Sequence, residues 1–203
     1  MRAFNERAPR AVGDVVGGLR STSTEHPNPQ SKMGRTLVLS PERVERTITR
    51  LAYEVVERHR GASDLAVVGI RRRGVALAEA VAGEIGEIED RPLPVSELDT
   101  TPYRDDLSGS EPPEEQSAMR SEIAGRDVLL VDDVLFTGRT ARAALDALVQ
   151  HGRPRTIQLA ILVDRGHREY PIRPDYVGRS LQTKPRERVV VDTDGDFAVY
   201  VDG

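Results

Sequence analysis

The sequence predicts a single α/β domain with a central parallel sheet flanked by helices. Three short apolar runs, at residues 65–70, 127–131 and 157–163, have the length and composition of buried strands. Helical segments alternate with these runs, and this alternation favours parallel pairing because each connecting helix must cross the sheet. Sheets of this kind bind ligands beyond the carboxyl ends of their strands, so candidate site residues are expected there.

The first helix is predicted at residues 41–59. Ser40 is a typical N-cap residue, Pro41 suits the first helical position, and Glu42 lies in the first turn. Apolar residues then recur at helical spacing from Val44 onward, and Gly61 marks the end of the helix. The pattern predicts one helix face that is buried against the sheet.

The remaining elements follow from similar patterns. A turn at residues 71–74 precedes an alanine-rich helix at 75–85, and a further strand is predicted at 93–98. Residues 138–151 form a third helix, and residues 189–191 and 197–201 form a hairpin. The stretch 107–117 is rich in Pro, Gly, Ser and Glu and has no apolar face, which predicts a mobile lid.

Composition excludes several classes of site and of location. The 203 residues contain no cysteine, so disulfides, thiolate nucleophiles and cysteine-bound zinc are excluded. The four histidines (26, 59, 151 and 167) lack metal-ligand spacing. There is no apolar run long enough to span a membrane and no secretory signal, so a cytoplasmic protein is expected, without membrane partners.

Polar, glycine-rich residues at the N-terminus predict a disordered extension at 1–35, followed by one domain at 36–203. Met33 directly precedes the first structured stretch and is a candidate start of translation. The formal net charge is −4, but residues 153–188 carry an excess of arginine over acidic side chains. A local basic face is therefore expected on an acidic protein.

The segment 131–140 carries the chemistry. Asp132 and Asp133 follow a predicted strand, and a helix begins a few residues later. A helix N-terminus offers free backbone N–H groups to a phosphate, Thr137 and Thr140 add hydroxyl donors, and Gly138 permits a close approach. The aspartates could instead merely end the strand and cap the helix.

The combination fits a ligand that carries a vicinal diol and a 5′-phosphate on one ring. Two adjacent carboxylates can accept hydrogen bonds from sugar hydroxyls or hold water around a divalent ion. The glycine and lysine spacings of a dinucleotide fingerprint and of a Walker loop are absent from this segment.

The segment resembles the phosphoribosyl diphosphate signature of type I phosphoribosyltransferases. More narrowly, the chain from about residue 37 onward resembles the bacterial pyrimidine operon regulatory proteins with uracil phosphoribosyltransferase activity. The stretches that carry the resemblance are 103–107 (YRDDL), 135–140 (LFTGRT), 144–148 (ALDAL), 152–154 (GRP), 162–169 (LVDRGHRE), 171–173 (PIR) and 175–178 (DYVG).

The resemblance implies a parallel core sheet, a hood over the nucleobase and a flexible lid. It implies the reaction of uracil with phosphoribosyl diphosphate to give UMP and diphosphate, through an oxocarbenium-like state at ribose C1. It also implies Mg²⁺, bound mainly through phosphoribosyl diphosphate with Asp132 and Asp133 nearby. A homodimer or tetramer is expected from the family.

Site residues follow from the motif matches. Asp132, Asp133 and Arg104 are the expected catalytic residues, and Arg104 should reach the diphosphate. The expected contacts to phosphoribosyl diphosphate or UMP are Arg72, Arg73, Arg104, Asp132, Asp133, Arg165 and Val189, together with the loop Val134, Leu135, Phe136, Thr137, Gly138, Arg139 and Thr140.

Family members also present a surface to pyrimidine operon messenger RNA. This chain has Arg72 where the family usually has threonine, and Tyr53 where it usually has histidine. Residues 179–184 replace the usual Lys-Asn-x-Pro-Thr-Ser stretch. The expected RNA contacts are Thr49, Arg50, Tyr53, Arg72, His167, Arg168, Arg173 and Arg179.

Three functions remain open from the sequence. The first is a bifunctional protein that binds the messenger RNA leader when UMP is bound and also converts uracil to UMP. The second is a regulator that senses nucleotide and catalyses weakly. Residues 71–74 resemble the family's diphosphate loop, and Arg72 alters that loop. The third is a uracil phosphoribosyltransferase without an RNA partner. Regulation, where present, would act on transcription termination or on translation.

Overall fold

The computed structural model describes residues 34–105, 114, 116–193 and 195–203. Nearly all of the predicted extension at 1–35 and most of the predicted lid at 107–117 lie outside the described residues. The helices are α1 (Pro41–His59), α2 (Arg73–Ile88) and α3 (Arg139–Leu148), and a 3-10 turn spans Thr101–Tyr103. The strands are β1 (Arg35–Leu39), β2 (Leu65–Ile70), β3 (Val95–Leu98), β4 (Asp127–Leu135), β5 (Thr156–Asp164), β6 (Tyr176–Ser180), β7 (Arg188–Asp192) and β8 (Ala198–Asp202).

A five-stranded sheet forms the centre of the domain, with the strand order β3-β2-β4-β5-β6. Every neighbouring pair in it is parallel, and β4 in the middle aligns Leu130 with Val68 on one side and with Leu159 on the other. The predicted α/β fold with a central parallel sheet is confirmed. The strand β6 was not predicted, because its exposed Arg179 and Ser180 end a segment that the sequence marks only as basic.

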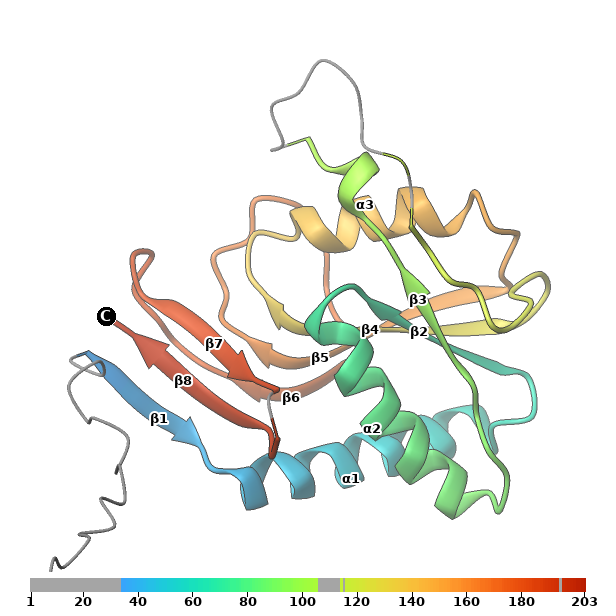
Figure 1. The fold of residues 1–203 in the computed structure, drawn as a ribbon, viewed down its shortest axis with the longest axis horizontal. Helices are drawn as coiled ribbons and strands as arrows, with labels where there is room; N and C mark the ends of the chain where they lie inside the picture. Colours follow the sequence, from blue (N-terminus) through green and yellow to red (C-terminus); the bar gives the residue numbers. More distant parts are fainter. Residues whose placement is uncertain (1–33, 106–113, 115, 194) are drawn as a thin grey trace, which may run out of the picture. The chain divides into compact units, whose positions relative to one another are not determined.

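Helices cover both faces of this sheet (Figure 1). The helices α1 and α2 pack on one face, where Leu51 and Ile85 join Leu129 and Leu162 in a common core. The helix α3 packs on the other face, where Leu148 meets Leu130 and Ile161. Consecutive residues of β4 therefore enter opposite cores, as the alternation of side chains along a strand requires. Among the described residues, no helix is long and apolar enough to cross a membrane.

A second, antiparallel sheet has the order β1-β8-β7. The predicted hairpin is present as β7 and β8, with Val189 opposite Val201. The strand β1 pairs with β8 at the outer side and was not predicted, since only Leu39 of its five residues is fully buried. Strand β7 also contacts β4 near the end of the parallel sheet, which brings the two sheets together beside the predicted site.

The bounds of two elements next to the site differ from the sequence prediction. The strand β4 continues four residues beyond the predicted end at 131, because β5 runs alongside and pairs Val134 with Val163. Asp132 and Asp133 therefore lie within the strand. The helix α2 begins at Arg73, so its first turn includes Arg73 and Gly74, the second half of the turn that the sequence predicted at 71–74.

Candidate active site

The two adjacent aspartates of β4 lie beneath the first turn of α2. Asp132 is only 8% exposed, and its Oδ1 accepts a hydrogen bond from the backbone N–H of Asp133 at 3.0 Å. A Cβ at Gly74 would meet the carbonyl oxygen of Val131 at 2.6 Å, so α2 can approach β4 this closely only with glycine at that position. The close approach explains why Asp132 is so deeply buried.

Burial changes the acidity of both side chains. It raises the pKa of Asp132 well above the ordinary value, and the neighbouring charge of Asp133 raises this pKa further. Burial also raises the pKa of Asp133, although Arg73 opposes that effect from 3.9 Å. The pair is thus strained when both carboxylates are ionised, and cationic or hydrogen-bond-donating ligands would relieve the strain.

A cavity of about 280 Å³ opens next to Asp132. It is lined by residues 134–140, the predicted phosphate-binding loop, which is called the phosphate loop below. Gly138 forms the N-cap of α3 with φ +92°, a conformation that favours glycine, and a Cβ there would lie 3.2 Å from that of Tyr170. The loop therefore presents the N-terminus of α3 to the cavity. The lining residues are Arg104, Asp132, Val134, Leu135, Phe136, Thr137, Gly138, Arg139, Thr140 and Ala141.

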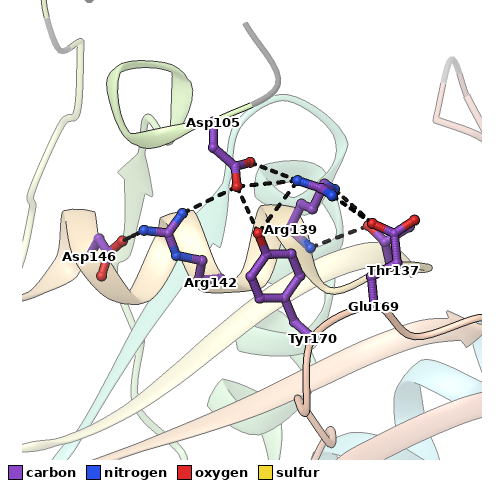
Figure 2. Close-up of polar contacts among 7 residues, drawn as sticks. All are labelled: Asp105, Thr137, Arg139, Arg142, Asp146, Glu169 and Tyr170. Carbon is purple, nitrogen blue, oxygen red and sulfur yellow. Dashed lines mark hydrogen bonds and ion pairs between the residues drawn. The ribbon is translucent and has the colours of Figure 1, made fainter.

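The side chain of Arg139 is held by carboxylates and a tyrosine rather than left free for a ligand (Figure 2). Its guanidinium pairs with Glu169 at 2.7 Å and with Asp105 at 3.2 Å. The hydroxyl of Tyr170 donates a hydrogen bond to Asp105 at 2.7 Å, which lowers the pKa of that carboxyl. The backbone N–H of Arg139 donates to Thr137 Oγ1 at 3.4 Å, within the same loop.

Glu169 and Tyr170 also hold the backbone of the phosphate loop in place. The backbone N–H groups of Glu169 and Tyr170 both donate to the carbonyl oxygen of Thr137. Arg142 pairs with Asp105 at 3.6 Å and with Asp146 at 2.9 Å, which extends the network along α3 (Figure 2). The loop conformation is thus set by contacts with residues about thirty positions later in the chain.

A second cavity of about 520 Å³ adjoins the first, and the two share Arg104, Asp132, Val134 and Thr140 as lining residues. Arg104 donates a hydrogen bond to Thr140 at 3.1 Å at this boundary, and its charge partly offsets the rise in the pKa of Asp132. The peptide bond between Arg71 and Arg72 is cis. The remaining lining residues are Arg71, Arg72, Arg73, Thr100, Thr101, Asp133 and Arg188.

Two predicted substrate contacts line neither cavity. Arg165 is 6% exposed, and its guanidinium lies 4.1 Å from the centre of the Phe136 ring. It also donates to Thr183 Oγ1 at 3.2 Å and to the carbonyl oxygen of Lys184 at 3.1 Å, and burial lowers its pKa. Val189 belongs to β7, and its side chain is buried in the core. The side chains of both residues are therefore turned into the protein.

The predicted RNA contacts divide into exposed and engaged side chains. Tyr53 is 59% exposed, and Arg72, Arg173 and Arg179 are also exposed. Arg50 pairs with Glu54 and donates to backbone carbonyl groups of β6, and His167 lies 2.6 Å from the carbonyl oxygen of Thr183. Thr49 donates to the Glu45 carbonyl oxygen within α1.

Arg168 has a structural position. Its guanidinium forms an ion pair with Asp164 at 2.7 Å and donates to the carbonyl oxygens of Phe136 and Ile172. Phe136 belongs to the phosphate loop, so replacement of Arg168 would disturb the candidate active site as well as any RNA surface. A variant at Arg168 would therefore not test an RNA surface alone.

Sequence reasoning missed three residues that line the second cavity. Thr100 and Thr101 follow β3 at its carboxyl end, which is a position that could have been inspected for each strand of the parallel sheet. Arg188 comes from the antiparallel sheet, and no local pattern indicates that its side chain reaches a cavity of the parallel sheet.

Comparisons with known proteins agree with this arrangement. The sequence matches the phosphoribosyl transferase domain family over residues 36–196. The bifunctional protein PyrR of Pelotomaculum thermopropionicum is 50% identical over 169 residues, which cover 81% of this chain and 93% of that protein. The bifunctional protein PyrR of Deinococcus radiodurans is 50% identical over 166 residues, which cover 79% and 91%. The chain belongs to the PyrR family.

Solved structures support the fold independently. The hypoxanthine phosphoribosyl transferase of Trypanosoma cruzi superimposes with a TM-score of 0.66 at 17% identity, over 86% of this chain and 95% of that one. At this identity the likeness establishes the fold alone. The expected membership in the pyrimidine operon regulatory family of type I phosphoribosyltransferases, with their fold and enzyme class, is confirmed.

Proposed function

We propose that this protein transfers the phosphoribosyl group of phosphoribosyl diphosphate to uracil and releases diphosphate. The observation that carries the proposal is the position of Asp132 and Asp133 in β4, next to two adjoining cavities. One cavity has the N-terminus of a helix and two threonines, and the other has several arginines. A ligand with a phosphate at one end, a ribose in the middle and a diphosphate at the other end matches this order.

In this proposal the 5′-phosphate binds at the loop 134–140. The backbone N–H groups at the start of α3 and the hydroxyl groups of Thr137 and Thr140 would donate to it, and the helix dipole favours a negative charge there. Arg104, which already contacts Thr140, would stand between this phosphate and the diphosphate. The ribose hydroxyl groups would donate to Asp132 and Asp133, which would relieve the repulsion within the buried pair.

The diphosphate would bind at the second cavity, near Arg72 and Arg73. As the bond between ribose C1 and the diphosphate oxygen breaks, the electron pair leaves with the diphosphate, and C1 gains positive charge. Arginines stabilise the growing negative charge of the leaving group, while the carboxylates lie near the cationic sugar. Uracil N1 then bonds to C1, and its proton is released with the diphosphate product.

The antiparallel sheet and the segment after β5 would form the hood for uracil, with backbone groups at Arg165 and Val189 facing the base. Magnesium would arrive with the diphosphate, since Mg²⁺ in such sites is bound mainly by phosphates and one or two carboxylates. Asp132 and Asp133 supply carboxylate oxygens that fit this role, and the described residues contain no cluster of three or more ligating side chains. When bound, the ion would neutralise charge on the diphosphate.

The activity is tested by steady-state formation of UMP and diphosphate from uracil and phosphoribosyl diphosphate with Mg²⁺. Hypoxanthine serves as the comparison base, because the fold is shared with hypoxanthine phosphoribosyl transferases. We expect turnover with uracil and at least a hundredfold lower efficiency with hypoxanthine. Absence of UMP formation, or equal use of both bases, would contradict the proposal.

We further propose that the protein binds a pyrimidine operon messenger RNA leader when UMP is bound. The support comes from exposed Tyr53 on α1 and exposed Arg179 on β6, two elements that Arg50 joins through hydrogen bonds. An aromatic ring can stack on an unpaired base, and arginines can contact phosphates. Arg173 adds a further exposed cation after β5.

A gel-shift titration with the leader tests this second function. UMP should tighten binding of the leader, and the leader should tighten UMP by the same factor, because coupling between two binding sites is reciprocal. Replacement of both Arg173 and Arg179 by alanine should reduce the salt slope by roughly one unit per lost phosphate contact, with uracil turnover unchanged. Arg168 is left intact because it supports the phosphate loop.

The outcomes separate the three functions that the sequence leaves open. Turnover without leader binding indicates a uracil phosphoribosyltransferase alone, whereas leader binding with weak turnover indicates a nucleotide sensor. Light scattering on the same samples tests the proposed homodimer or tetramer.

A further inference from the structure

One arginine of the antiparallel sheet has no assigned role and no partner within the described residues. Arg188 begins β7, is exposed to solvent, and stands opposite Asp202 of β8 in the strand register. Asp202 pairs with Arg35 at 3.3 Å instead. Within the described part of the chain, the guanidinium of Arg188 takes part in neither a hydrogen bond nor an ion pair.

Arg188 lies at the second cavity of the candidate active site. It lines the cavity of about 520 Å³ that also holds Arg71, Arg72 and Arg73. Among the described residues that line this cavity, Arg188 is the one from the antiparallel sheet, and the others come from the parallel sheet and its loops. Contact between β7 and β4 brings it to the same cavity as the turn at residues 71–73.

The charges around this cavity favour an anionic ligand with more than one charge. Five arginines and two aspartates line it, and burial disfavours the ionised form of both aspartates. Arg71 is already engaged, since it donates to the Gln116 carbonyl oxygen at 2.7 Å. Arg72 and Arg188 are left with unpaired guanidinium groups in the described residues. Like charges at close range repel, and a polyanion between them removes that cost.

We propose that Arg188 binds the diphosphate group of phosphoribosyl diphosphate and so closes the diphosphate subsite from the side of the antiparallel sheet. The inference rests on the proposed function and adds a substrate contact to it. Arginine suits this position because its planar guanidinium can donate two parallel hydrogen bonds to one phosphate group. The contact between Arg188 and diphosphate would be strongest after the bond to ribose C1 has broken. The diphosphate then keeps the electron pair of that bond and carries more negative charge.

The alternative role for Arg188 is contact with the base, because the next residue, Val189, is the expected neighbour of the base. A guanidinium can stack on a pyrimidine ring instead of pairing with a phosphate. The two roles make opposite predictions for UMP, which carries the base and the 5′-phosphate but no diphosphate. Binding of UMP therefore distinguishes them.

The experiment compares Arg188→Gln with the wild type and with Arg186→Gln as the matched control. Arg186 is exposed and lies two residues earlier in the same segment, but it does not line the cavity. Isothermal titration with Mg²⁺ measures the Kd of phosphoribosyl diphosphate, of UMP and of free diphosphate for each protein. Arg188→Lys is included because lysine restores the charge without the fork of donors.

We expect Arg188→Gln to raise the Kd of phosphoribosyl diphosphate and of free diphosphate at least tenfold. The Kd of UMP should change less than twofold. Arg188→Lys should recover part of the loss, and Arg186→Gln should match the wild type. Unchanged binding of phosphoribosyl diphosphate would overturn the inference, and an equal loss for UMP would assign Arg188 to the base instead. Since the readout is binding, a wild type that binds both ligands but does not convert uracil would refute the proposed activity without deciding the role of Arg188.

Discussion

The two ends of β4 carry the same type of side chain in opposite environments. At the amino end, Asp127 accepts two hydrogen bonds from Arg155, at 3.0 and 2.7 Å, and one from Thr156 at 2.7 Å. These donors hold the pKa of Asp127 well below its usual range. Toward the carboxyl end, Asp132 is buried and Asp133 is half-buried, and the pKa values of both are raised.

The difference shows which end of the strand is built for stability and which for a ligand. Asp127 has its partners within the protein and needs nothing further. Asp132 and Asp133 accept backbone hydrogen bonds, and the Arg73 guanidinium lies 3.9 Å from the Asp133 carboxylate. A buried carboxylate without strong partners costs stability, and such costs persist in proteins mainly where function needs them. Replacement of each aspartate by asparagine therefore tests the difference between the two ends of the strand.

The largest effect is expected for Asp133→Asn. Loss of the charge removes an acceptor for the ribose and a counter-charge for the cationic sugar. Catalytic efficiency with uracil should fall about a hundredfold, roughly 2.7 kcal/mol, while the thermal unfolding temperature stays equal or rises. Steady-state kinetics and calorimetry on the same preparation measure both quantities. A loss of less than about tenfold would contradict the assigned role.

An intermediate effect is expected for Asp127→Asn. It should lower the stability of the fold and leave catalytic efficiency nearly unchanged. The amide cannot replace the charge-assisted hydrogen bonds with Arg155, so urea denaturation should show a free energy of unfolding lower by about 2 kcal/mol. Catalytic efficiency should stay within about twofold of the wild type, because the residue lies at the far end of the strand. A comparable loss of turnover at both positions would remove the distinction between the two ends.

The pH dependence of this difference has a definite sign. A carboxyl whose pKa is lowered by folding stabilises the fold above its ordinary pKa, and this stability is lost as the pH falls. The gap between the wild type and Asp127→Asn should therefore narrow as the pH is lowered below about 4, the ordinary range of aspartate.

The smallest effect, and one of opposite direction, is expected for Asp132→Asn without ligand. Folding raises the pKa of Asp132, so the folded state binds its proton more tightly than the unfolded chain does. Ionisation of this residue then lowers stability as the pH rises through the region between the two pKa values. The neutral amide avoids this, and the free energy of unfolding at pH 7 should rise by an amount on the order of 1 kcal/mol. A less stable variant at pH 7 would show that ionised Asp132 has partners that favour its charge.

Local patterns predicted the buried elements of the fold but missed two of its edge strands. The helix α1 and the strands β2, β4 and β5 were predicted because their apolar spacing is a property of neighbouring residues. The edge strands β1 and β6 were missed, since each is only partly buried and is defined by pairing with one partner strand. The end of β4 was placed too early for the same reason, because β5 extends it through pairing.

The site divides in a similar way. The segment 131–140, with its carboxylate pair, its glycine and its two threonines, is recognisable without a structure, and it indicated the family. Residue types and their spacing are enough for this, because the strand, the loop and the helix are contiguous in the chain. The predicted contacts of the individual residues remain predictions for the experiments above.

The surroundings of each charged side chain depend on the tertiary fold. It turned Arg139 toward Asp105 and Glu169, joined Arg168 to the backbone of the phosphate loop, and brought Arg188 from a second sheet to the arginines after β2. It also buried Asp132 beneath Gly74 of α2 and thereby raised its pKa. Burial and charge proximity arise from contacts between residues 30 to 120 positions apart, which no local pattern in the sequence contains.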